Sequence, residues 1–213
     1  SMNKPVSVLR PLAKAVAGVA LLATLNGCVG LVAGGAVMTA VSANDRRTLG
    51  AQTEDKAIAV KGESRARSIV GEQGHVNVTS FNRKVLLTGE VRDEEMKAAV
   101  EREVRAISGI TSLVNELEIG SPSKYTTRTN DALITTKVKA SLVDMQTISA
   151  NSFKVVTERG NVYLMGIVTP REAQIGTDIA RGVSGVQKVV KVFEYINDVN
   201  LNALPPVSNA TGS

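Results

Sequence analysis

Hydrophobic and polar residues alternate along two stretches of the chain, and the second stretch repeats the first. Residues 76–95 read VNVTSFNRKVLLTGEVRDEE, and residues 154–173 read KVVTERGNVYLMGIVTPREA. Aligning Gly89 with Gly166 places the copies 77 positions apart, and the valines and leucines around both glycines then fall into the same register. A repeat of this length predicts two copies of one structural unit.

Within each copy the alternation has a period of two, which is typical of a strand with one buried face. It is interrupted by Asn82-Arg83 in the first copy and by Arg159-Gly160-Asn161 in the second. Polar and glycine residues at such interruptions are typical of tight turns. We therefore expect a β-hairpin in each copy, with one face against helices.

A helical pattern follows each hairpin. Asp93 can cap the first of these helices, and residues 169–172 (Thr-Pro-Arg-Glu) match a capping box with proline at the first helical position. The predicted buried stripe of the first helix comprises Met96, Ala99, Val100, Val104 and Ile107. That of the second comprises Ala173, Gly176, Ile179, Ala180 and Val183.

Further elements complete the repeated unit. Gly109 and Gly185 are expected to end these helices. Third strands are predicted at residues 110–118 and 186–196, and helices ahead of the hairpins at residues 55–70 and 131–143. Each unit is thus predicted to be an α-β-β-α-β module of the α+β class. It has a three-stranded mixed sheet covered on one face by two helices.

The first thirty residues have a different pattern. The basic residues Lys4, Arg10 and Lys14 precede or border an apolar run over 15–25, and Leu25-Asn26-Gly27-Cys28 resembles the lipobox of bacterial lipoproteins. The resemblance implies that Cys28, the only cysteine, carries lipid and that residues 1–27 are removed as a signal peptide. The alternative is an uncleaved membrane helix, but eleven residues fall short of the ~20 that a span needs.

The residues after Cys28 bear on location. Val29, rather than Asp, follows the cysteine, and in Gram-negative lipoproteins this implies sorting to the outer membrane with the protein facing the periplasm. Residues 29–43 are small and apolar and contain no charge. They are expected either to lie against the bilayer surface or to form a flexible tether.

The two modules resemble BON domains, because each has a strand with a glycine between hydrophobic residues and a later Ser-Gly-Ile or Ser-Gly-Val step. The match spans about residues 55–197, and VYLMGIVTPREA (162–173) and NDALITTKV (130–138) are similar to dual-BON outer-membrane lipoproteins. The resemblance implies a protein that supports outer-membrane integrity. It also implies that the second BON domain binds anionic phospholipid through its first helix.

The predicted boundaries follow from these patterns. They are a signal peptide at 1–27, a lipidated tether at 28–54, a first BON domain at 55–119, a linker at 120–129, a second BON domain at 130–197, and a disordered tail at 198–213. The linker is short, so the modules are expected to touch.

No residue pattern indicates catalysis. His75 is the only histidine and precedes a strand, where a solvated or capping role is expected. Asp93-Glu94-Glu95 begin a helix, where acidic side chains interact favourably with the helix dipole. We predict no catalytic residues, no metal site and no cofactor. An enzyme acting on cell-wall sugars would need paired carboxylates that no segment presents. The strand glycines, Gly89 and Gly166, are expected to admit a closely packed helix.

Charge narrows the range of partners. The chain has a net charge of +5, with ten basic and eleven acidic residues at 55–119 and eight basic and six acidic at 130–197. This basicity is too mild for a nucleic-acid partner, and no small-molecule substrate is indicated. Anionic phospholipid remains plausible, at about 1 kcal/mol per basic residue near the surface.

The predicted lipid-binding residues lie on the first helix of the second module. If Ile134, Val138 and Leu142 face the sheet, the outward residues are Leu133, Lys137 and Ala140, with Lys139 beside them. Leu133 stands where one protein of the resembled family has Trp, which would imply weaker binding here. An ordinary solvated helix face is the alternative. A competing hypothesis is a module that docks an outer-membrane protein assembly partner through its edge strands.

Overall fold

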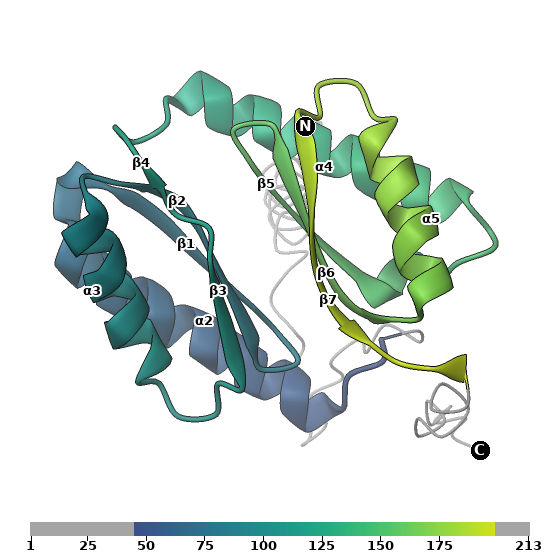
Figure 1. Cartoon of the computed structure of the whole chain (residues 1–213), viewed down its shortest axis with the longest axis horizontal. Coiled ribbons are helices and arrows are strands. Elements are labelled where there is room, and N and C mark those ends of the chain that lie inside the picture. Colours follow the sequence, from purple (N-terminus) through teal and green to yellow (C-terminus); the bar gives the residue numbers. More distant parts are fainter. Residues whose placement is uncertain (1–44, 199–213) are drawn as a thin grey trace, which may run out of the picture. The chain divides into compact units, whose positions relative to one another are not determined.

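The computed structural model describes residues 45–198, so the predicted signal peptide, Cys28 and the tail from residue 199 lie outside the described residues. The described part belongs to one compact unit and contains two copies of one order of elements (Figure 1). The first copy comprises α2 (Leu49–Val70), β1 (His75–Phe81), β2 (Lys84–Val91), α3 (Glu94–Arg105), β3 (Ser112–Asn115) and β4 (Glu118–Ile119). The second comprises α4 (Tyr125–Asp144), β5 (Phe153–Glu158), β6 (Asn161–Val168), α5 (Pro170–Arg181) and β7 (Lys188–Tyr195).

Each copy builds a mixed sheet with helices on one face. β1 and β5 pair antiparallel with β2 and β6, respectively, and β3 and β7 add to these central strands in parallel. Helices α2 and α3 cover the first sheet, and α4 and α5 cover the second (Figure 1). In the first copy the third strand is interrupted between β3 and β4, and the Leu117 side chain in this interruption is buried in the core. The predicted α-β-β-α-β module is confirmed in both copies.

The hairpin turns have a left-handed backbone, which Asn82 and Gly160 favour and which the arginine beside each of them also adopts. Asn82 and Arg83 have φ values of 50° and 64°, and Arg159 and Gly160 have φ values of 51° and 76°. Two consecutive positive φ angles give a turn whose twist matches that of the flanking strands. The turns therefore lie where the interrupted alternation predicted them.

Two buried aspartates hold these turns. Asp55 accepts the backbone N–H groups of Asn82 and Arg83, both at 2.7 Å, and Asp131 accepts those of the equivalent second turn at 2.8 Å. The sequence predicted that Asp55 and Asp131 begin their helices. Instead, α2 begins at Leu49 and α4 at Tyr125, so α4 extends into the predicted linker. In the sequence pattern, each aspartate looks like the polar first residue of an amphipathic helix. In the structure each lies within its helix and is buried because its carboxylate binds a hairpin turn.

The helices after the hairpins match their predicted starts and buried faces. Asp93 accepts the N–H of Met96 at 2.8 Å, and Thr169 and Glu172 form the predicted reciprocal capping box. The predicted stripes pack in two cores: Met96, Val100, Val104 and Ile107 are buried in the first, and Ala173 and Ala180 in the second, where Ile179 and Val183 are partly buried.

The strand glycines have a different role from the predicted one. A Cβ at Gly89, whose φ is 116°, would lie 1.9 Å from the His75 carbonyl oxygen, and a Cβ at Gly166 would lie 2.2 Å from that of Ser152. The close neighbour is therefore the backbone at the start of the adjacent strand, β1 or β5. The prediction of a packed helix at these glycines was wrong. Close helix packing occurs instead at helical glycines, since a Cβ at Gly176 would lie 2.5 Å from the Phe153 ring.

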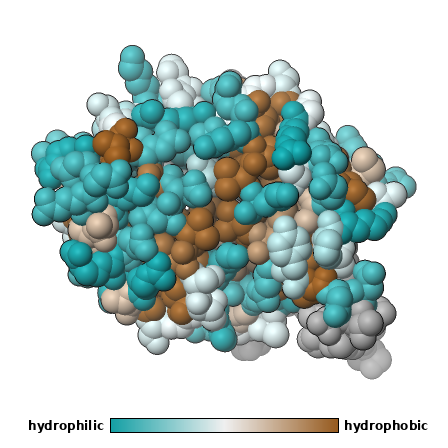
Figure 2. Space-filling model, viewed as in Figure 1, coloured by the Kyte–Doolittle hydropathy of each residue, from teal (hydrophilic) through white to brown (hydrophobic). Residues whose placement is uncertain are grey.

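A third hydrophobic cluster joins the sheet faces that the helices leave open. Its buried members come from both modules and are Phe81, Leu86, Tyr163, Met165, Ile167 and Val192. On the outer surface, Figure 2 shows hydrophobic residues gathered in a band across the middle of the view. The two modules are thus in contact, as the short linker led us to expect.

Two arginines ahead of α2 strengthen this contact. Arg46 forms two hydrogen bonds of 2.7 Å with the Glu172 carboxylate in the second module. Arg47 pairs with Asp55 at 2.9 Å and lies 4.2 Å from the centre of the Phe81 ring in the first. Two neighbouring arginines, Arg46 and Arg47, therefore bind one module each.

Candidate functional site

The predicted lipid-binding residues all lie on the exposed side of α4. Its buried face is made by Asp131, Ile134, Val138 and Leu142, three of which the sequence predicted. Leu133 is 56% exposed, and Lys137, Lys139 and Ala140 are exposed as well. Leu133, Lys137 and Ala140 follow helical spacing, so they form one stripe, and Lys139 lies on its flank.

The same helix exposes further apolar side chains that the sequence prediction missed. Tyr125 is 84% exposed and Val143 66%, and Met145, which caps the helix, is 38% exposed. Of the eight large hydrophobic residues exposed within residues 45–198, four therefore belong to α4 or its cap. Tyr125 and Val143 are 18 positions apart in the sequence, which is about five helical turns, so they share one side of α4, roughly 80° around from Leu133.

The cations beside this stripe are not neutralised. Neither Lys137 nor Lys139 forms a salt bridge with another described residue. Lys154, on the neighbouring strand β5, has a pKa below its usual value because of partial burial and because Lys139 and Arg47 add positive charge nearby. A pocket of about 320 Å³ lies here, lined by Lys139, Leu142, Val143, Phe153 and Lys154, with Asp45 also among its lining residues. Mutual repulsion of these cations favours a negative ligand.

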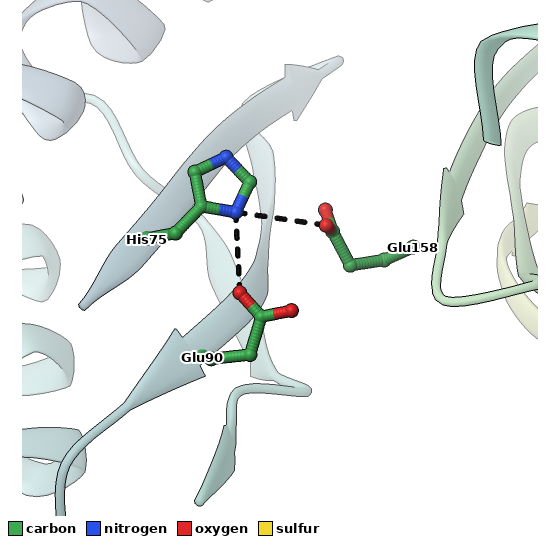
Figure 3. A group of neighbouring side chains, drawn as sticks. All are labelled: His75, Glu90 and Glu158. Carbon is green, nitrogen blue, oxygen red and sulfur yellow. Dashed lines mark hydrogen bonds and ion pairs between the residues drawn. The ribbon is translucent and has the colours of Figure 1, made fainter. Parts of the chain in front are cut away.

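A second polar group lies where the modules meet. His75, at the start of β1, faces Glu90 on β2 and Glu158 on β5, with its Nδ1 3.2 Å and 3.6 Å from their carboxylate oxygens (Figure 3). The expectation that His75 is solvated or caps an element was wrong, because its side chain is 19% exposed and bonds to a strand carboxylate.

The two carboxylates of this group have opposite pKa shifts. Burial raises the pKa of Glu90, but hydrogen bonds from His75 and Arg159 outweigh burial and lower it to about 2. Burial also raises the pKa of Glu158, and there the hydrogen bond from Asn77 does not compensate, since Glu90 and Asp131 add negative charge. Glu158 is therefore the carboxylate whose charge is least satisfied.

The sequence reasoning did not find this group, because its members lie up to 83 positions apart and meet only when both modules are folded. No described helix is long and apolar enough to span a membrane. Within residues 45–198, this is the one group of histidine and carboxylate side chains whose ligand atoms converge.

The folds and their repeated order define two BON domains, and the BON domain family matches residues 56–121 and 130–197. The chain belongs to the BON-domain family.

Two relatives extend the similarity beyond the modules. The chain is 34% identical to the outer membrane lipoprotein DolP of Haemophilus influenzae, over 89% of this chain and 99% of that protein. It is 30% identical to a 21 kDa hemolysin of Actinobacillus pleuropneumoniae, over 71% of this chain and 79% of that protein.

A solved structure covers much of the chain at low similarity. The C-terminal domain of CdsD, a structural protein of the type III secretion system of Chlamydia trachomatis, covers 65% of this chain and 96% of its own length at 11% identity. The TM-score between the two structures is 0.28.

Proposed function

We propose that this chain is an outer-membrane lipoprotein, attached through lipid on Cys28 and facing the periplasm, that binds anionic phospholipid through α4. Binding of this kind would help to maintain the integrity of the outer membrane, without catalysis. The attachment is supported by the lipobox resemblance around Cys28 and by similarity to DolP along almost the whole of that protein.

The observation that carries the lipid proposal is the combination on α4 of exposed apolar side chains with unpaired lysines. Leu133 presents a hydrophobic side chain to solvent one turn before Lys137, and neither residue contributes to the core. A helix at a membrane interface buries such an apolar face while its basic residues contact headgroups. The same surface would have no stabilising role in water.

The lipid on Cys28 and the patch on α4 would act as two membrane signals. The lipid would tether the chain, and the basic apolar patch would add a second, charge-selective contact. Because the second contact is then intramolecular, modest affinity at α4 is enough to orient the protein on an anionic surface.

The test uses the fragment from Asp45 to Asn197, which lacks the lipid and the apolar tether, in co-sedimentation with liposomes. We expect binding to vesicles containing an anionic phospholipid and none to neutral vesicles, with binding weakened as salt rises, because screening shortens the range of charge attraction. Leu133→Asp with Lys137→Glu is expected to abolish binding and leave the circular dichroism spectrum unchanged.

The first module supplies a matched control. Asp55 and Asp131 hold equivalent turns, so positions 76 residues apart correspond, and Ala57 and Lys61 are the counterparts of Leu133 and Lys137. Ala57→Asp with Lys61→Glu makes similar changes on α2 and is expected to leave binding intact. Equal loss in both variants, or none in the α4 variant, would remove the lipid site from α4.

Docking to a protein of the outer-membrane assembly machinery is the alternative outcome. β7 is an edge strand of the second sheet, and Tyr195 at its end is 55% exposed. Failure of the fragment to bind either kind of vesicle would favour that alternative, since a protein partner recognised by strand addition is indifferent to lipid charge.

A further inference from the structure

Three ligand-type atoms from three strands converge at the module contact. His75, Glu90 and Glu158 each offer one ligand atom within 4.8 Å of the other two, and Nδ1 of His75 faces Oε2 of Glu90 and Oε1 of Glu158. Figure 3 shows Nδ1 turned toward both carboxylates and the second ring nitrogen turned away. His75 and Glu90 are partners in the β1–β2 register, so the sheet fixes two of the three, and only folding of the second module brings Glu158.

The spacing suits a small divalent cation. Zinc bound to nitrogen and oxygen at about 2.1 Å in tetrahedral geometry holds its ligand atoms roughly 3.4 Å apart. The histidine nitrogen lies 3.2 Å from one carboxylate oxygen and 3.6 Å from the other. Small side-chain rotations would therefore complete a three-ligand site.

Each carboxylate has one oxygen held from outside and the other directed inward. Oε1 of Glu90 accepts from Arg159 at 2.6 Å, and its Oε2 faces His75. Oε2 of Glu158 accepts from Asn77 at 2.8 Å, and its Oε1 faces His75. Metal ligands in proteins are usually oriented by such outer hydrogen bonds.

The charge of the group also favours a cation. Glu90 is fully buried and the Glu158 side chain is 7% exposed, but among the described residues the one ion-pair partner of Arg159 is Glu90. Within the described residues, the only ion-pair partner of Glu158 is His75. Buried carboxylates are costly unless they are paired or bind metal, and a divalent ion would satisfy Glu158.

We propose that His75, Glu90 and Glu158 form a binding site for one divalent transition-metal ion, best matched by zinc, at the contact between the two BON domains. Imidazole with carboxylates suits such metals, and three protein ligands leave a position for water. Because two ligands belong to the first module and one to the second, the ion ties the modules together.

The test measures zinc binding to the full chain, produced without a histidine tag and with Cys28→Ser so that the thiol cannot bind. After metal removal with EDTA, calorimetric titration in detergent is expected to show one equivalent of bound zinc. His75 is the only histidine, so long-range nitrogen NMR gives one imidazole pattern. Its Nδ1 resonance is expected to shift with zinc and not with magnesium.

Matched variants connect the binding to these side chains. Zinc is expected to raise the unfolding temperature of the parent chain. Glu158→Gln and His75→Gln are each expected to weaken zinc binding at least tenfold and to abolish this rise. Glu103→Gln, at an exposed position on α3, removes the same kind of carboxylate and is expected to change neither. The proposal would be overturned if the parent chain did not bind one equivalent of zinc, or if it bound zinc without a shift of the Nδ1 resonance. Both measurements use the parent chain, so they do not depend on the stability of any variant.

Discussion

The first helices of the two modules, α2 and α4, occupy equivalent places and carry equal net charge, yet they present different surfaces. Helix α2 contains four basic and three acidic residues, and α4 contains three and two. At corresponding positions α2 has Ala57 where α4 has Leu133, and Arg67 where α4 has Val143. Net charge therefore does not distinguish the helices. Both expose apolar side chains, Leu49 and Val60 on α2 and Tyr125, Leu133 and Val143 on α4, so the difference lies in where these side chains are placed.

The comparison separates what the fold requires from what each module adds. Both modules keep the strand glycine, the buried aspartate and the left-handed turn. They differ in their outward helix faces. Changes at shared features should cost stability in both modules, whereas changes at the differing positions should affect binding alone.

The largest expected effect is at the shared strand glycines. Gly89→Ala and Gly166→Ala each place a Cβ against a backbone carbonyl and are expected to lower the free energy of unfolding by about 4 kcal/mol or more, measured by urea denaturation. Gly71→Ala is the control, because its φ is 50° but no atom lies within 4 Å of its Cβ. It should cost about 1 kcal/mol of backbone strain. Similar losses at all three positions would refute the steric explanation.

The buried aspartates should show an intermediate and unequal effect. Asp131→Ala leaves two turn N–H groups without their acceptor and is expected to cost about 2 kcal/mol. Asp55→Ala also removes a hydrogen bond from Ser80 and the ion pair with Arg47, so about 3 kcal/mol is expected. Urea denaturation curves of the two variants measure the difference. A larger loss for Asp131→Ala would contradict this assignment of contacts.

The smallest effect tests the helix comparison directly. Leu133→Ala gives α4 the residue that α2 carries and is expected to weaken liposome binding by about 1.4 kcal/mol, roughly tenfold, because less apolar surface enters the membrane. Stability should be unchanged, since Leu133 is exposed. Ala57→Leu serves as the reciprocal variant, and vesicle titration measures both. Undiminished affinity of Leu133→Ala would mean that the apolar stripe does not bind lipid.

Local sequence predicted much of the fold because the interactions that decide it are local. The cap at Asp93 and the capping box at Thr169 each involve residues three positions apart, and the turn at Asn82 interrupts a plain alternation. The exposure of Leu133 and Lys137 also followed from helical spacing. The role of Gly89 was not predicted, since its close neighbour is the backbone of His75, fourteen positions away.

The sequence by itself determined the repeat, the order of elements in each module and the outward face of α4, because periodicity and capping act within a few residues. Only the tertiary structure decided that Asp55 and Asp131 bind the hairpin turns. It alone brought His75 and Glu90 to Glu158. These contacts join groups that lie 27 to 83 positions apart in the sequence, and no periodic pattern predicts which distant partner a buried polar group will meet.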